Sequence, residues 1–432
     1  MTVDQVVTLL VLGGVVAMLI WDRLRADVVA LSGAAILLMT GVVRPSEVQG
    51  AFASPAIIAL ASLFVIAYAL ELSGLLDRAI ALGVALCRRM GAKGIWLLLS
   101  MIGGVSCFLN STPIVVLGAP VIRDVANALR QSPKRYLMPL SYITVLTGCC
   151  TLIGTSTNLL VDDMARIAGQ PRFGIFEITP VGLPMAVVGG LYLFLVSGRL
   201  IRHEDREEDA PPVDMSHIAS AQVGDASLFA VKRPLQLRKA LAALGVFAGA
   251  IILAALNVAP IAATALSGAV LLILMRVISA DEAYSGLKPE ILILIAGMVV
   301  IGIALEESGL ADAASRMLIA RVHGLSPLVA LIVLYLVTMV LTELLSNATV
   351  AVLVTPVAVA LAESLSVSPR PFLVAVMMAA SAAFSTPFGY QTNVIVYQMG
   401  GYRYMDFVRV GLPLNLITCA TAIVAIQLFF PF

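Results

Sequence analysis

The chain has 432 residues, of which 60% are hydrophobic and 12% are charged, and its formal net charge is +1. Because soluble domains carry about 25% charged residues, this composition excludes an ordinary soluble protein and is typical of a helical integral membrane protein. The apolar stretches run continuously instead of alternating, which argues against an outer-membrane barrel, and the nearly neutral charge gives no reason to expect nucleic acid as a partner.

Apolar runs long enough to span a bilayer recur along the whole chain, and polar residues interrupt some of them. In the first half we expect, in order, spans at 5–22, 26–43 and 54–72, an amphipathic stretch at the interface, a split pair of runs at 94–129, an interrupted segment at 136–168 and a span at 178–200. In the second half we expect spans at 237–256, 260–278 and 290–306, an amphipathic stretch, a split pair at 327–365, an interrupted segment at 370–399 and a span at 409–430. The predicted fold class is therefore an all-α polytopic membrane protein.

The two halves also share short sequences at nearly one spacing. ELSGLLDRA at 71–79 corresponds to EESGLADAA at 306–314, Pro120 to Pro356, Ser132-Pro133 to Ser368-Pro369, Gly154 and Asn158 to Gly389 and Asn393, and VGLP at 181–184 to VGLP at 410–413. Such a series indicates duplication, and internal repeats are characteristic of secondary transporters. We therefore predict transmembrane repeats at 1–200 and 237–432, joined by a polar linker at 201–236.

The distribution of lysine and arginine predicts how the repeats lie in the membrane. If each split pair is a re-entrant hairpin, each repeat crosses the membrane five times, and the second repeat has inverted topology. With both termini outside a cell (inner) membrane and the linker in the cytoplasm, those of the 27 lysines and arginines that remain outside are Arg44, Arg166, Arg172, Arg316, Arg321 and Arg370. This bias follows the positive-inside tendency and supports the re-entrant interpretation.

Polar sequences break the two interrupted segments at equivalent places, TLIGTSTN at 151–158 and FSTPFGYQTN at 384–393. Backbone that leaves the helix inside a bilayer has to be buried in protein or line a watery cavity. Helix amino termini suit an anion, whereas unwound carbonyls and the oxygens of Asn, Ser and Thr suit Na⁺. We therefore expect an ion and substrate site near the midplane. The candidate anion ligands are Asn110, Ser111, Thr112, Thr155, Ser156, Thr157, Ser346, Asn347, Thr349, Thr386, Pro387, Tyr390, Gln391 and Thr392.

Two hydroxyl residues precede the hairpin tips at helical spacing. Ser106 lies four residues before Asn110, and Thr342 lies four residues before Ser346, so each hydroxyl shares a helix face with the tip that follows it. Each hydroxyl either joins a cation shell at the tip or returns a hydrogen bond to its own helix. The polar residues of the tips, and the asparagine that follows each break, either face an ion or form hydrogen bonds between helices.

The sequences LNSTPIVVLGAPV, TLIGTSTNLLV, LSNATVAVLVTPV and STPFGYQTN resemble the divalent anion/sodium symporter family, within the ion transporter superfamily. This resemblance implies a homodimeric secondary carrier with an elevator-like transport domain that holds both hairpins and both broken helices. The family's Ser-Asn-Thr signature falls on Asn110-Ser111-Thr112, where the order departs, and on Ser346-Asn347-Ala348, where alanine replaces threonine. The Na⁺ ligands that it implies are Ser106, Asn110, Ser111, Gly154 and Asn158 in the first repeat and Thr342, Ser346, Asn347, Gly389 and Asn393 in the second.

These observations predict a Na⁺-coupled importer of a small divalent anion. Sulfate or a related oxyanion is slightly favoured over a C4-dicarboxylate, because no Arg or Lys is expected inside the membrane, so that amides, hydroxyls and helix ends have to hold the anion. The alternative is a Na⁺/H⁺ antiporter or an arsenite-type efflux carrier, which needs a titrating acid at the midplane; Glu343 is the only carboxylate well inside a hairpin arm. This carboxylate either takes a proton, balances a cation, or pairs with a backbone group. No His/Asp/Ser constellation, intramembrane HExxH or cofactor fingerprint predicts an enzyme or a cofactor.

Overall fold

The computed structural model describes residues 2–21, 24–75, 78, 90–197, 234–256, 258–310, 326–387 and 389–432. Most of the first amphipathic stretch expected at 73–90, and most of the linker expected at 201–236, lie outside the described residues. In the first half the helices are α1 (Val3–Trp21), α2 (Ala26–Met39), α3 (Pro45–Phe52), α4 (Pro55–Leu72), α6 (Ala92–Ser106), α7 (Ser111–Ala128), α8 (Lys134–Gly148), α9 (Ser156–Ile167), α10 (Thr179–Tyr192) and a π-helical turn η1 (Leu193–Ser197). In the second half they are α13 (Leu237–Ala255), α14 (Ile261–Leu274), α15 (Ala280–Gly286), α16 (Pro289–Glu307), α18 (Pro327–Leu344), α19 (Asn347–Ser364), α20 (Arg370–Ser381), α21 (Gln391–Gly400) and α22 (Tyr404–Phe429).

The all-α membrane fold predicted from the sequence is confirmed. Among the described residues, seven helical stretches are long and apolar enough to cross a membrane: Pro45–Leu72, Thr179–Val196, Leu237–Ala255, Pro289–Glu307, Pro327–Leu344, Asn347–Ser364 and Tyr404–Phe429. Two short helices were not expected. α3 precedes α4 and α15 precedes α16, so the third span of each repeat follows a short helix that ends a few residues before the proline that starts the span, Pro55 or Pro289.

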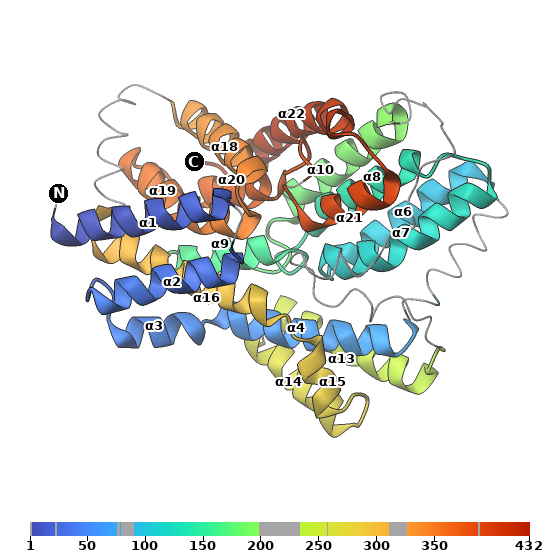
Figure 1. Ribbon diagram of the computed structural model, residues 1–432, viewed down its shortest axis with the longest axis horizontal. Helices are drawn as coiled ribbons and strands as arrows, with labels where there is room; N and C mark the ends of the chain where they lie inside the picture. Colours follow the sequence, from blue (N-terminus) through green and yellow to red (C-terminus); the bar gives the residue numbers. More distant parts are fainter. Residues whose placement is uncertain are drawn as a thin grey trace.

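The packing of the helices repeats between the two halves. α16 packs against α2, and the corresponding pair is α4 against α14. α19 packs against α9, and the corresponding pair is α7 against α21; likewise α8 contacts α10 as α20 contacts α22. In Figure 1 the first hairpin, α6 and α7, extends to the right of the centre, whereas the second hairpin, α18 and α19, extends to the left. The two hairpins therefore reach the centre of the molecule from opposite ends.

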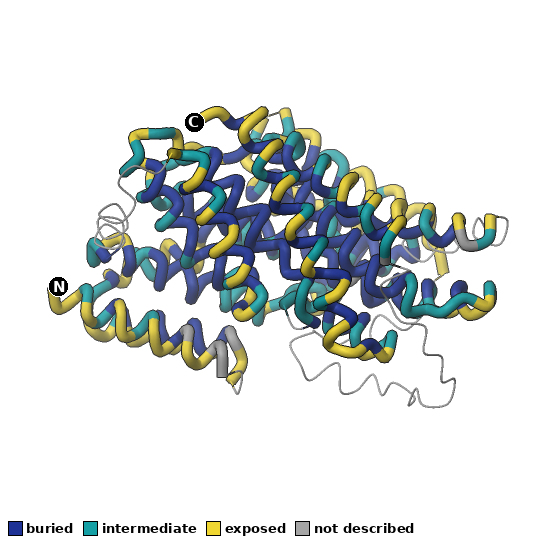
Figure 2. Tube along the Cα trace, turned by 90° about the horizontal axis from the view of Figure 1, so that it is seen from above, coloured by how far each residue is buried: buried dark blue, intermediate teal, exposed yellow. Residues whose placement is uncertain are grey.

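The outward faces of the peripheral helices are apolar. Exposed large side chains there include Leu10 on α1, Leu183 on α10, Leu241 on α13, Leu274 on α14 and Leu428 on α22. Figure 2 shows exposed segments along the outside of the bundle, while the segments at its centre are buried. Exposed apolar surface of this extent is expected where a protein faces lipid instead of water.

Contacts between loops agree with the predicted sides of the membrane. On the side predicted to be outside, the contacts are Gln5 Nε2 to Gly309 O, Arg44 to Glu307, and Arg370 Nη2 to Arg172 O. On the side predicted to be cytoplasmic, they are Gln236 N to Ser73 O and Tyr402 O–H to Lys134 O. Each contact joins loops that the charge distribution places on the same side. Which side faces the cytoplasm stays a prediction.

Candidate functional site

The amino ends of four described helices lie at the hairpin tips and at the breaks. α7 begins at Ser111 after the cap residue Asn110, and α19 begins at Asn347 after the cap residue Ser346. α9 and α21 begin directly after the two breaks. The Asn110 side-chain oxygen accepts a hydrogen bond from Thr112 N at 3.0 Å. The amino ends of helices carry partial positive charge and free N–H groups, so these four ends suit an anion.

The first cradle is formed by Ser106, Ser111, the Thr144 carbonyl, Gly154 and Asn158. Ser106 Oγ and Ser111 Oγ donate to Thr144 O at 2.9 and 3.0 Å, and the two hydroxyl oxygens are 3.1 Å apart. Ser106 therefore bonds to the broken helix α8, and the alternative that it bonds to its own helix is wrong. Asn158 is fully buried, and its Oδ1 has no hydrogen-bond partner among the described residues.

Gly154 is required by the close approach of three backbone segments in this cradle. A Cβ atom at Gly154 would lie 2.4 Å from Gly148 O and 2.6 Å from Cys107 O. The amide of Gly154 donates to Thr151 Oγ1 at 3.2 Å, and the Thr151 carbonyl accepts from Asn158 Nδ2 at 3.0 Å. The break thus gathers carbonyl and hydroxyl oxygens within one turn of chain, which is the donor set that a hard cation prefers.

The second cradle repeats these bonds 235 or 236 residues later. Thr342 Oγ1 donates to Ala380 O at 2.7 Å, as Ser106 does to Thr144 O. Asn393 Nδ2 donates to Thr386 O at 3.2 Å, as Asn158 does to Thr151 O, and Gly389 N donates to Thr386 Oγ1 at 3.0 Å. The correspondence of Gly154 and Asn158 with Gly389 and Asn393 predicted from the sequence therefore extends to individual hydrogen bonds.

The amide of Asn347 in the second cradle also has a buried atom without a partner among the described residues, its Nδ2. Thr342 Oγ1 lies 2.8 Å from Asn347 Oδ1 and 2.7 Å from Ala380 O. A hydroxyl carries one proton, so Thr342 cannot donate to both oxygens at once. Exchanging the amide oxygen and nitrogen of Asn347, whose assignment rests on the hydrogen-bond network, lets its NH₂ donate to Thr342. Oδ1 is then the buried atom without a partner.

The two cradles meet through side chains of the tips and breaks. Thr112 of the first tip donates to Gln391 Oε1 at 3.3 Å. Ser141 on α8 lies 2.7 Å from Thr392 Oγ1 and donates to Asn393 Oδ1 at 2.7 Å. Residue 348 corresponds to Thr112 but is alanine, so the second tip has no hydroxyl for the equivalent contact. The residues between the cradles are consequently arranged asymmetrically.

The remaining predicted anion ligands either lie buried near the tips and breaks or form local hydrogen bonds. Tyr390 lies beside the hydroxyls of Ser111 and Thr155. Thr157 and Pro387 are buried in or beside the breaks. The others in the second repeat have local bonds: Ser346 Oγ lies 2.7 Å from Thr349 Oγ1, where it caps α19, and Thr386 donates to a carboxylate.

That carboxylate is Glu343, and three donors surround it. Its Oε1 accepts from Ser385 N at 2.7 Å and from Asn415 Nδ2 at 2.8 Å, and its Oε2 accepts from Thr386 Oγ1 at 2.8 Å. Glu343 therefore ties α18 to the second break and to α22, which is the alternative of pairing with a backbone group.

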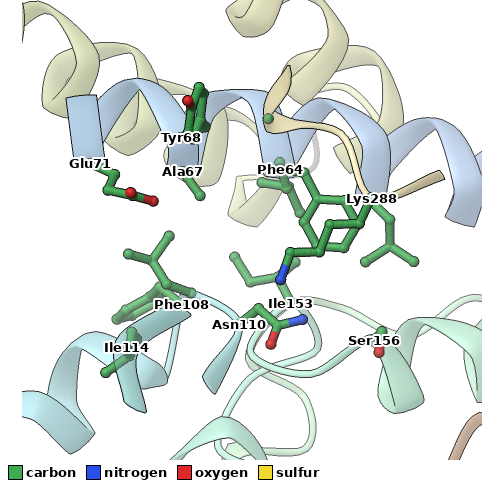
Figure 3. A pocket seen from close by; sticks show the side chains of 14 residues that line it. Phe64, Ala67, Tyr68, Glu71, Phe108, Asn110, Ile114, Ile153, Ser156 and Lys288 are labelled. Atoms are coloured by element: carbon green, nitrogen blue, oxygen red, sulfur yellow. The ribbon is translucent and has the colours of Figure 1, made fainter. Parts of the chain in front are cut away.

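A pocket separates the first tip from α4. Its wall on one side is formed by Leu60, Leu63, Phe64, Ala67, Tyr68, Glu71, Gly286 and Lys288, and on the other side by Phe108, Leu109, Asn110, Ile114, Ile153 and Ser156. Figure 3 shows the Lys288 side chain reaching from the α4 side towards Asn110. The Lys288 ammonium lies 5.9 Å from the centre of the Phe64 ring, near the middle of α4. A lysine is thus present beside the tip, where the sequence predicted a loop position.

Several residues of this region were not expected from the sequence. Ser141, Asn415 and Lys288 each contact or face a predicted site residue. A signal existed for Asn415, which is an isolated amide inside the apolar final helix. Ser141 and Lys288 lie near the site only because of how the broken segments fold back.

Comparisons with known proteins agree with a transport function. A family model described as citrate transporter matches residues 16–366 and 344–432. An uncharacterized transporter of Synechocystis is 26% identical over 98% of this chain and 97% of its own length. A sodium-dependent dicarboxylate transporter, SdcS, of Staphylococcus saprophyticus is 24% identical over 92% of this chain and 80% of its own length. Among solved structures, the YdaH transporter of Alcanivorax borkumensis shares the fold, with a TM-score of 0.56 and 14% identity over 96% of this chain and 98% of that one.

Proposed function

The chain belongs to the citrate transporter family, and from the chemistry of its two cradles we propose that it couples the entry of Na⁺ to the uptake of a small divalent anion. The observation that carries this proposal is Asn158 Oδ1, a buried amide oxygen without a donor among the described residues; exchanging the amide atoms of Asn347, whose Nδ2 is the atom without a partner as placed, would give the second cradle such an oxygen too. A buried acceptor without a partner is costly, and a cation is the species that satisfies it. Hydroxyl and carbonyl oxygens surround both atoms, as Na⁺ prefers.

The anion is proposed to lie between the cradles, at the amino ends of α7, α9, α19 and α21. The positive ends of these helices stabilise negative charge without a charged side chain. A cation in each cradle adds further positive charge beside the anion, which provides a physical basis for coupling. The name of the similar dicarboxylate transporter supports sodium dependence and an anionic substrate. Sulfate and C4-dicarboxylates are the two classes to compare.

We extend the proposal to an elevator-type motion in a homodimer. The hairpins and broken helices would move as one transport unit, with their two repeats inverted in the membrane, against α1–α4 and α13–α16. The support is the pocket between α4 and the first tip, because it lies where the two parts meet. The termini would lie outside and the linker in the cytoplasm, as the positive-inside tendency suggests.

Uptake into proteoliposomes tests the proposal. Labelled sulfate and succinate are supplied with and without an inward sodium gradient, to the native protein and to Asn158→Ala and Asn127→Ala variants. Asn127 is an exposed asparagine near the end of α7 and serves as the matched control. We expect sodium-dependent uptake that Asn158→Ala reduces by about tenfold or more, the equivalent of at least one lost charge-assisted contact of ~1.4 kcal/mol.

Two results would contradict this function. Uptake of either anion at the same rate without sodium would refute the coupling. If the Asn158→Ala and Asn127→Ala variants both took up the anion with the same sodium dependence as the native protein, the assignment of the first cradle as a cation site would be refuted.

A further inference from the structure

The pocket between α4 and the first tip has an ammonium, an amide and a helix amino end close to the tip, and a carboxylate, Glu71, further along α4. Lys288 contributes an ammonium, and Asn110 contributes its amide NH₂, because the amide oxygen is already used by Thr112 N. Ser156, the first residue of α9, brings the positive end of that helix to the same pocket. The tip side of the pocket and Lys288 therefore offer donors and positive charge.

The Lys288 ammonium lacks a partner of opposite charge in this part of the molecule. Among the described residues, no carboxylate lies within the 4.0 Å of an ion pair and no acceptor is hydrogen-bonded to it. Glu71 and Glu290 influence it electrostatically from a greater distance. A half-buried cation that faces apolar walls and another donor is unfavourable unless an anion joins it. The ammonium of Lys288, without an ion-pair partner among the described residues, therefore favours an anionic group at the end of the pocket next to Asn110.

The apolar side chains that line the pocket indicate which chemical groups the ligand has besides its negative charge. Leu60, Leu63 and Phe64 line one side, and Phe108 and Ile153 line the other. These side chains cannot donate hydrogen bonds to the four oxygens of a sulfate ion, but they can contact a hydrocarbon body. The geometry therefore favours a carboxylate with an apolar body, and it removes the reason for preferring sulfate, which was the expected absence of a lysine near the site.

We propose that Lys288 is a substrate-binding residue, whose ammonium pairs with one carboxylate of an organic dianion that the first tip presents through Asn110 and the end of α9. The proposal rests on the transport function proposed above. The pocket extends along α4 to Glu71, towards the end of the helix that is predicted to be cytoplasmic. Lys288 would then stand on the route between the tip and the cytoplasm.

The experiment varies both the charge of the substrate and the charge of the side chain at position 288, and measures uptake for each combination. Variants are Lys288→Gln, Lys288→Arg and, as a matched control, Lys93→Gln at an exposed lysine in the first turn of α6. Uptake is measured for succinate and for its monoamide, succinamate, which has one carboxylate less. We expect Lys288→Gln to raise the KM for succinate by about tenfold or more and to raise it less for succinamate, because a hydrogen bond to a charged group contributes ~1.5–3 kcal/mol. Lys288→Arg should stay within about threefold of the native KM, which corresponds to less than ~1 kcal/mol.

A binding measurement separates this inference from the transport function. In detergent, succinate should raise the Tm of the native protein and of Lys93→Gln, but not that of Lys288→Gln, whereas sodium should raise the Tm of all three. A native KM and succinate response in Lys288→Gln would overturn the role of Lys288 and leave sodium-driven uptake standing. An equal rise in KM for both substrates would also overturn it, because that pattern indicates a structural effect. Failure of the native protein to take up either substrate with sodium would instead refute the transport function, and this inference with it.

Discussion

The two cradles have the same backbone plan but different charge. Ser106 and Thr342 bond to equivalent carbonyls, and each break has a closely packed glycine, with the tighter packing at Gly154. The residues around this shared plan differ. Glu343, Ser385 and Asn415 form a charged network in the second cradle, whereas the corresponding positions of the first repeat are Cys107, Cys150 and Ala186.

This difference in charge predicts that the two cradles bind a cation with different affinity. A carboxylate beside an oxygen-lined site strengthens the binding of a cation, because opposite charges attract strongly where water is scarce. The first cradle has no such charge among its described residues, and it depends on neutral oxygens. We therefore expect the second cradle to bind its cation more tightly and the first to be the weaker site.

The largest effect should come from adding a methyl group to the glycine of the first break. In Gly154→Ala the new Cβ would meet two backbone oxygens at 2.4 and 2.6 Å, whereas in Gly389→Ala it would meet Ala383 Cβ at 2.9 Å and Thr386 Oγ1 at 3.0 Å. We expect Gly154→Ala to abolish uptake and to lower the free energy of unfolding by at least ~3 kcal/mol, the upper range of overpacking. Gly389→Ala should keep part of the uptake activity and should lose less of the free energy of unfolding.

The measurements are the yield of monodisperse protein, its thermal unfolding, and uptake. Gly190→Ala is the control, because nothing lies within 4 Å of its added Cβ. If both break variants lost the same stability, the first cradle would not be the more tightly packed of the two, and the contrast drawn from the backbone distances would be wrong.

Removing the charge of the second cradle should have the next largest effect. In Glu343→Gln the amide oxygen still accepts from Ser385 N and Asn415 Nδ2, and the new NH₂ can donate to the hydroxyl oxygen of Thr386. Folding should therefore persist, while the sodium concentration for half-maximal uptake rises about tenfold, as expected for a loss of ~1.4 kcal/mol. The anion KM at saturating sodium should stay native.

This experiment also tests the antiporter alternative. Glu363→Gln, at an exposed carboxylate near the end of α19, is the control. Sodium flux that is linked to proton movement in the native protein and absent in Glu343→Gln would support a proton carrier at this position. An unchanged sodium requirement in Glu343→Gln would show that the two cradles do not differ through this charge.

The positions of the hairpins and breaks could be predicted because polar residues interrupt apolar runs there. The expected breaks at 151–158 and 384–393 agree with the unwound segments before α9 and α21, and the expected hairpins agree with α6–α7 and α18–α19 within a few residues. Local sequence is sufficient for these features, since Asn, Ser and Gly stop helices by their own chemistry.

The partners of the site residues could not be predicted in the same way. Helical spacing left two targets open for the Ser106 hydroxyl, and only the tertiary fold selects the Thr144 carbonyl. The position of Lys288 depends on the short break between α15 and α16, which bends the chain towards the middle of α4. Neither a hydrophobic period nor a charge count contains that information.

The smallest expected effect should come from removing the hydrogen bond between Ser141 of the first repeat and Asn393 of the second break. Ser141 donates to Asn393 Oδ1 at 2.7 Å, whereas the corresponding Asn158 Oδ1 has no donor among the described residues. Ser141→Ala frees the oxygen of Asn393 and makes the two breaks alike. We expect a loss of about 1 kcal/mol in the free energy of unfolding, typical of one hydrogen bond, and a sodium affinity that is equal to or slightly higher than the native one. Thermal unfolding across a sodium titration measures both, with Ser100→Ala, an exposed serine on α6, as the control. A marked fall in sodium affinity would mean that the Ser141 hydroxyl itself contacts the cation, so that the second cradle extends into the first repeat.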